Sequence, residues 1–238
     1  MAPATDRAKF SPLFYLSTML ILLPGAAYGQ SASTEVMPER RVYLEFDLNT
    51  HLEPHAEGGY QTYAPRVVYG LRKNVEIGLN LEASHPVVPD QGIELQPNVK
   101  WQFHNDETKG VAASVGAIVF VPIIRRGGTD AFSMIYTNVS KQIQGDYGPK
   151  FTGGAFLVIG RQPGFGSKGG AIVGYSQPLH RRIGFDLTWW SSSNDRFGYA
   201  TPSLSFRVTR KSQVTIGYAF GNVGRKNNEL ALAYGIEF

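Results

Sequence analysis

The sequence predicts an all-β fold, an antiparallel transmembrane up-and-down β-barrel of about twelve strands, with ten or fourteen strands as the alternatives. Three observations lead to this prediction: a strict alternation over residues 229–238, about eleven further strand-like segments, and an export signal over residues 1–29. Within 229–238, every even position is large and apolar and every odd position is small or acidic. A period of two places these side chains on opposite faces of a strand, as in a barrel wall between lipid and a wet lumen.

The N-terminus predicts a secretory signal peptide. Arg7 and Lys9 precede an apolar stretch over residues 13–23, and small residues follow it. A basic start, a short apolar centre and small residues at the cleavage point are the pattern of such a signal. The apolar run is too short for a comfortable membrane-spanning helix, so we expect export and removal of the signal rather than anchoring.

The exported chain is predicted to be one domain. Cleavage after Gly29, with cleavage after Ala27 or Ala32 as alternatives, leaves about two hundred residues. We expect a short periplasmic segment over 30–39 and the barrel over 40–238. The absence of Cys excludes disulfides and thiolate metal sites. The formal charge of +4 is too small and too scattered to indicate nucleic-acid binding.

Twelve segments have the composition of strands and end at polar or glycine-containing turns. In the third, Ile77 and Leu79 alternate with Glu76 and Asn80, and the fourth, ninth and eleventh alternate equally clearly. The fifth is rich in Val, Ile and Gly and makes a poor helix. The sixth, seventh and tenth alternate less clearly, and Pro202 in the tenth indicates a bulge. In order, the segments are 40–50, 60–72, 75–84, 93–104, 110–122, 131–143, 150–160, 169–177, 181–191, 197–208, 212–221 and 228–238.

Aromatic residues fall near the predicted strand ends. A soluble β-sandwich also alternates, but it does not need aromatic belts at two levels. Two belts flanking an apolar band are typical of membrane barrels. If the odd strands run outward, one belt contains Trp101, Phe103, Phe206 and Phe238 near the periplasmic rim, and the other contains Tyr63, Phe120, Trp189 and Phe220 near the outer rim.

The last strand resembles the C-terminal strand of bacterial outer-membrane β-barrels, in which a final Phe is a hallmark. The resemblance implies that Phe238 is an assembly signal read by the barrel-assembly machinery. We expect the first and last strands to pair antiparallel and to place Phe238 near Arg40 and Arg41, because closure removes both exposed sheet edges. The location that follows is the outer membrane of a Gram-negative cell.

Charged residues occupy many positions that are predicted to face inward. The first hairpin places Glu45 and Asp47 opposite Arg66, and the second places Asn80 beside Arg66 and near Glu82. These five residues are the candidate lumen constriction, because opposed charges set ion preference in narrow pores. A salt-bridged network that only fills a narrow barrel has the same composition. Inward acidic residues outnumber basic ones, which predicts a mild cation preference, and the loops are too short for a substantial plug.

The sequence predicts no enzyme, no cofactor and no metal site. The five His residues lie near turns or loops, and His51 and His55 are expected to be solvated. Residues 191–195 contain Ser, Asn and Asp, but these residue types gather in turns for backbone reasons. Neither a Gly-x-Ser-x-Gly elbow nor a metal-ligand spacing occurs.

Residues 65–78 resemble a hairpin of the family of outer-membrane barrels named for the phenol-degradation meta (MetA) pathway. The matching features are a Tyr-Gly-Leu that ends one strand, a short polar turn and a Val-Glu-Ile that begins the next. Residues 98–100 and 217–218 also fit, whereas residues 122–124 read Pro-Ile-Ile where the family often has Pro-Thr-Gly. The resemblance implies uptake of hydrophobic or small organic solutes.

The predicted function is therefore a passive, porin-like channel for small solutes. Its expected partners are outer-membrane lipid, lipopolysaccharide, the barrel-assembly machinery and the solutes themselves. A structural or lipid-interacting barrel with a closed, salt-bridged lumen is the alternative, and an outer-membrane enzyme is a second alternative.

Overall fold

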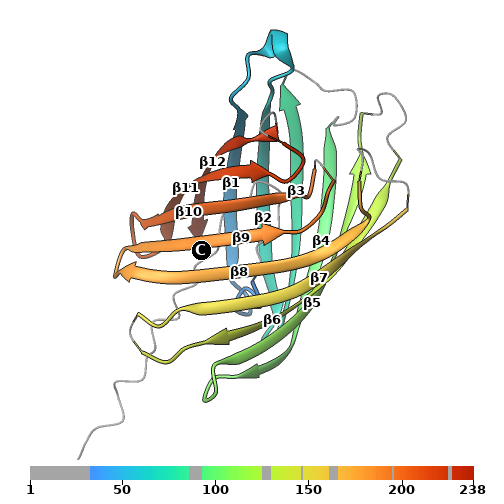
Figure 1. The fold of residues 1–238 in the computed structure, drawn as a ribbon. Coiled ribbons are helices and arrows are strands. Elements are labelled where there is room, and N and C mark those ends of the chain that lie inside the picture. The colour runs from blue at the N-terminus through green and yellow to red at the C-terminus, as the bar shows by residue number, and fades with distance from the viewer. Residues whose placement is uncertain are drawn as a thin grey trace, which may run out of the picture.

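Twelve antiparallel strands close into one barrel (Figure 1). The computed structural model describes residues 33–238 except 86–92, 125–129, 146, 161–165, 195 and 225–226. Each strand pairs with its neighbours in the sequence, and β12 pairs with β1. The predicted fold class and strand number are confirmed, while the predicted signal peptide lies outside the described residues.

The strand boundaries lie within about three residues of the predicted ones. No helix in the described part of the chain is long and apolar enough to cross a membrane. The strands are β1 (Val42–His51), β2 (Gln61–Arg72), β3 (Val75–His85), β4 (Glu94–Asp106), β5 (Val111–Pro122), β6 (Phe132–Gln142), β7 (Lys150–Ile159), β8 (Gly169–His180), β9 (Ile183–Trp190), β10 (Tyr199–Arg207), β11 (Ser212–Gly221) and β12 (Glu229–Glu237), with one short 3-10 helix, η1 (His55–Glu57), between β1 and β2.

The barrel has two different ends. Short turns at residues 73–74, 107–110, 181–182 and 208–211 define what we call the turn end. The connections that follow odd-numbered strands define the loop end, where the β1–β2 hairpin with η1 extends beyond its neighbours at the top of Figure 1. This alternation of short and longer connections is typical of outer-membrane-type barrels.

The first and last strands close the barrel as predicted. Val42 and Phe238 exchange backbone hydrogen bonds, with N–O distances of 3.4 Å from Val42 and 2.8 Å from Phe238. Nine Cα pairs continue this ladder, from Tyr43 with Glu237 to His51 with Glu229. Phe238 therefore lies immediately beside the start of β1, and neither strand is left as an open edge.

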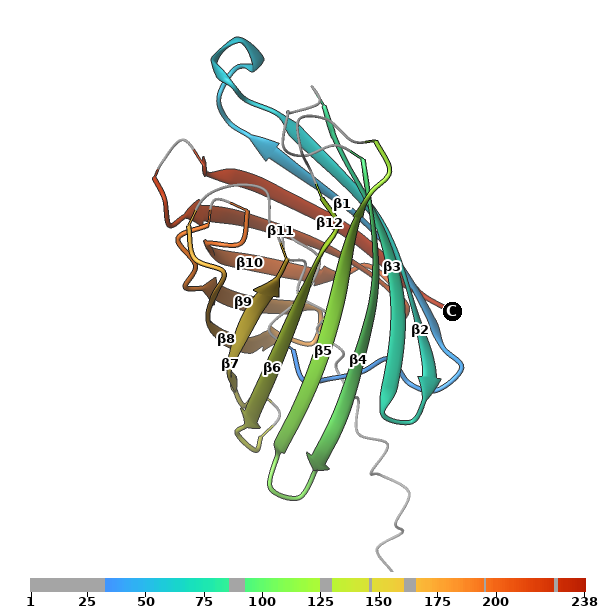
Figure 2. The ribbon, with the colours of Figure 1, turned by 90° about the vertical axis from the view of Figure 1, so that its right-hand side faces the viewer.

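Strand alternation separates an exposed apolar face from a buried inner face. On β3, Ile77 and Leu79 are exposed, whereas Asn80 and Glu82 are buried. On β12, Leu232 is exposed and Ala233 is buried. The strands are strongly tilted relative to the barrel axis (Figure 2). The exposed apolar face and the buried inner face both continue around the barrel. The predicted orientation of these strands is confirmed.

Phe120 contradicts the predicted outer aromatic belt because it faces the interior. It stacks on Phe132 with ring centroids 4.3 Å apart, and only 4% of its surface is exposed. Met134, Phe156 and Trp190 belong to the same buried cluster. Near Phe120 both faces of β5 are apolar, with Val119 and Val121 on the other face, so alternation alone could not identify which face meets lipid.

Candidate lumen constriction

Arg66 joins the two acidic residues that the first hairpin was predicted to bring opposite it. Its Nη1 lies 2.9 Å from Glu45 Oε1, and its Nη2 lies 3.0 Å from Asp47 Oδ2. The register of β1 and β2 pairs Glu45 directly with Arg66. The Tyr43 hydroxyl donates to the other carboxylate oxygen of Glu45 at 2.6 Å. All three charged side chains are thus held in fixed positions on the inner wall.

Asn80 and Glu82 continue this polar wall onto β3 and β4. Asn80 is the Cα partner of Arg66, as predicted. Its side-chain amide donates to Gln96 Oε1 at 3.3 Å, and Gln96 donates to Glu82 Oε2 at 2.8 Å. The structure therefore brings all five candidate residues together. Gln96, which was not among the candidates, connects Asn80 to Glu82 through its two hydrogen bonds.

Arg196 is the main interior residue that the sequence interpretation missed. It belongs to the β9–β10 connection, yet only 2% of its side-chain surface is exposed. Its Nη1 donates to Glu94 Oε1 at 3.1 Å, its Nη2 also pairs with Glu94 Oε2, and Nη2 lies 3.5 Å from Glu82 Oε1. Its guanidinium carbon is 5.0 Å from the centroid of Phe120. The β9–β10 connection therefore reaches across the barrel to β3 and β4.

Local turn chemistry directs Arg196 inward. The Asn194 side-chain oxygen accepts a hydrogen bond from the Arg196 N–H at 2.8 Å, and the Ser192 hydroxyl accepts one from the Asn194 N–H at 2.9 Å. This confirms that the Ser and Asn residues serve the turn. The β9–β10 connection is short, as expected, but its one long Arg196 side chain reaches the opposite wall.

Residues 33–38 form an internal segment that crosses the barrel near its lower end in Figure 2. The Met37 N–H donates to Glu76 Oε2 at 2.6 Å, and the Gln102 amide donates to the Thr34 carbonyl at 3.0 Å. Glu35 Oε1 lies 2.7 Å from Lys150 Nζ. These contacts join the segment to inward residues of β3, β4 and β7.

The Glu35 carboxylate holds this internal segment by charge. Burial would raise the pKa of Glu35, but the Lys150 ammonium and hydrogen bonds from Lys150 and Ser33 outweigh it and lower that pKa to about 2. The ionised form is therefore the stable one at neutral pH. An ion pair inside the barrel is less screened by salt than one at the surface.

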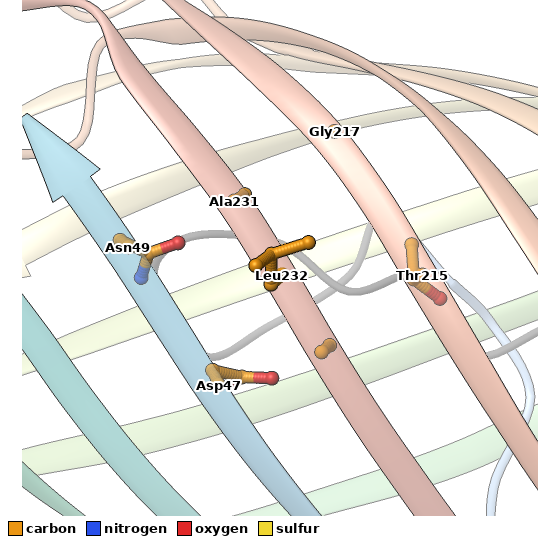
Figure 3. A pocket seen from close by; sticks show the side chains of 7 residues that line it. Asp47, Asn49, Thr215, Gly217, Ala231 and Leu232 are labelled. Atoms are coloured by element: carbon orange, nitrogen blue, oxygen red, sulfur yellow. The ribbon is translucent and has the colours of Figure 1, made fainter. Parts of the chain in front are cut away.

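Small side chains on β12 leave a cleft on the inner wall between the side chains of β1 and β11. Figure 3 shows Asp47 and Asn49 on β1 beside Ala231 and Leu232 on β12, with Thr215 on β11. Gly217 and Ala233 also line it. The cleft lies next to the Arg66 ion pairs, because Asp47 both lines the cleft and pairs with Arg66.

The prediction that His51 is solvated is wrong. His51 is buried, its ring lies 4.6 Å from that of Tyr60, and its Nε2 is 3.9 Å from Glu229 Oε1. The side chain of His55 lies outside the described set. Among the described residues, no group of three His, Cys, Asp or Glu side chains could hold a metal ion.

Comparisons with known proteins reveal similarity in fold. No protein-family model matches the sequence, and no curated protein matches it. Among solved structures, the NanC porin has a TM-score of 0.50 at 10% identity, covering 83% of this chain and 98% of that one. A structure from a study of in-meso crystallization of membrane proteins has a TM-score of 0.51 at 11% identity, covering 82% and 83%. The COG4313 outer membrane channel from Pseudomonas putida F1 has a TM-score of 0.48 at 12% identity, covering 88% and 100%.

Proposed function

We propose that this chain is a porin-like outer-membrane channel for small solutes. The observation that carries the proposal is the closed barrel with an apolar exterior and a charged interior. An exterior of exposed Leu, Ile, Val and aromatic side chains fits lipid, and charged side chains need the polar surroundings of a lumen. The fold likeness to the NanC porin supports the same assignment.

The outer membrane is the proposed location, with the turn end toward the periplasm. Lipid and lipopolysaccharide then surround the exposed apolar face. The exposed terminal Phe238 is the proposed signal for the barrel-assembly machinery. The export signal predicted over residues 1–29 belongs to the same proposal.

Arg66, Glu45 and Asp47 are proposed to determine the ion preference of the channel. Their fixed charges border the cleft along β11 and β12. Acidic side chains outnumber basic ones on the inner wall, so the channel should prefer cations mildly. The resemblance of residues 65–78 to the MetA-pathway barrels favours small hydrophobic or organic molecules as physiological solutes.

Planar-bilayer recording of the refolded protein tests the proposal. We expect conductance, with a reversal potential across a salt gradient that indicates a mild cation preference. Arg66→Ala should strengthen that preference, and Glu45→Gln combined with Asp47→Asn should weaken it. Conductance with the same selectivity in both variants would remove this site from the pore. Lys109→Gln, at the turn end, is the control that should leave selectivity unchanged.

A barrel with a closed lumen is the second candidate, and a specific observation favours it. Arg196 and the internal segment at residues 33–38 occupy the interior from opposite ends. A protein that inserts into bilayers, resists heat as a folded barrel and never conducts would support this structural role. The prediction that the protein is not an enzyme stays a prediction.

A further inference from the structure

Five cationic residues gather at two neighbouring connections of the turn end. Arg181 and Arg182 form the β8–β9 turn, while Arg207 ends β10 and is followed by Arg210 and Lys211. The Arg207 N–H donates to the Arg182 carbonyl at 2.8 Å, so the two connections lie side by side at the left of Figure 1. We call these five residues the basic turn cluster.

The basic turn cluster has no acidic partner within the described part of the chain. Arg181, Arg182, Arg210 and Lys211 are exposed, and neither connection contains an acidic residue. Glu237 lies beside Lys211 through a backbone hydrogen bond of 2.8 Å, but its carboxylate is 3.9 Å from Arg41. Arg207 is half-buried at the end of β10, and the four exposed charges in the adjacent turns repel one another, so an external anion would stabilise them.

Exposed apolar side chains lie directly beside these charges. Leu179 precedes the β8–β9 turn and is 55% exposed, and Val208 follows Arg207 and is 57% exposed. A soluble anion would contact the cations only. A ligand that carries both a negative headgroup and apolar chains would cover both kinds of surface.

An aromatic row on the outer wall indicates how deep the basic turn cluster lies in the membrane. Phe151, Tyr175 and Phe185 lie on β7, β8 and β9, with ring centroids 5.3 Å and 6.3 Å apart. Such rows mark the boundary of the hydrocarbon layer. Arg182 is three residues from Phe185 on the turn side, about 10 Å along a strand. At a strand tilt of about 45°, this distance is about 7 Å along the membrane normal. The headgroup layer extends about 5–7 Å beyond the hydrocarbon, so the cluster lies at headgroup level.

We propose that the basic turn cluster binds the phosphate headgroup of an anionic phospholipid in the inner leaflet, with Leu179 and Val208 against its acyl chains. This proposal rests on the proposed membrane location. The guanidinium group presents several N–H donors in a planar fork that matches phosphate oxygens, and four of the five cations are Arg. The partner is a lipid because one surface offers both cations for a phosphate and exposed apolar side chains for acyl chains.

Native mass spectrometry of the folded, detergent-solubilised barrel tests the proposal with phosphatidylglycerol as the probe. Arg181→Gln combined with Arg210→Gln should weaken phosphatidylglycerol binding by about tenfold to thirtyfold, since each cation near an anionic lipid surface contributes roughly threefold to fivefold. Lys109→Gln combined with Lys141→Gln removes the same charge at the same end. Lys109 is already 3.3 Å from Asp106, so this control pair should retain binding.

Three results would overturn the lipid site. These are equal binding of phosphatidylglycerol and phosphatidylcholine, equal losses in the two double variants, or full competition by free glycerol phosphate, which would indicate a soluble-anion site. Heat-modified gel mobility confirms that each variant is folded. Because binding is measured without conductance, loss of the lipid site leaves the channel proposal standing, and a non-conducting barrel that binds phosphatidylglycerol leaves the lipid site standing.

Discussion

Replacing Leu232 with Arg tests which face of the barrel meets lipid. Leu232 lies on β12 between Leu48 and Ile216, with 38% of its surface exposed. It is six residues before Phe238. At about 3.3 Å per residue and a tilt of about 45°, it lies about 14 Å from the turn end, near the middle of a hydrocarbon core about 30 Å thick. Leu232→Arg should therefore lower the free energy of unfolding in lipid by about 2–4 kcal/mol.

Reversible urea unfolding in phospholipid vesicles, followed by tryptophan fluorescence, measures this loss. Ile236→Arg is the matched control, because Ile236 shares the outward face but lies near the interface, where the cost falls to about 0–1 kcal/mol. Leu232→Ala separates lost packing from the cost of the charge. Equal losses for the two Arg variants, or no loss for Leu232→Arg, would refute the depth and orientation assigned to β12.

Three further predictions concern the interior and the C-terminus. Arg196→Gln leaves two buried carboxylates without their cation and should lower the free energy of unfolding by about 3–5 kcal/mol in the same urea assay; an unchanged midpoint would contradict the buried ion pair. The Glu35–Lys150 pair should stabilise the internal segment fully above pH 4.5, the ordinary pKa of a Glu carboxyl, and should lose that contribution as the pH falls toward about 2. Protease cleavage of the segment should therefore increase as the pH falls through this window. Glu35→Gln should abolish this pH dependence. Deleting Phe238 should reduce the amount of membrane-inserted barrel in cells more than it lowers the stability of refolded barrel, and wild-type insertion would contradict its role as an assembly signal.

The sequence by itself determined the barrel wall. Strand positions, closure of β1 on β12 and the inward direction of Glu45 and Asp47 all follow from a period of two and from short hairpin connections. The same local rules place Arg66 beside Asn80. These properties depend on neighbours within one hairpin, so they can be read along the chain.

Only the tertiary structure decided what fills the interior. Arg196 meets Glu94 across a separation of 102 residues, and Glu35 meets Lys150 across 115. Neither pairing has a periodic signal, because closure of the barrel, rather than local geometry, brings these residues together. Phe120 was misassigned for a related reason: its strand is apolar on both faces, and only closure determines which face is enclosed.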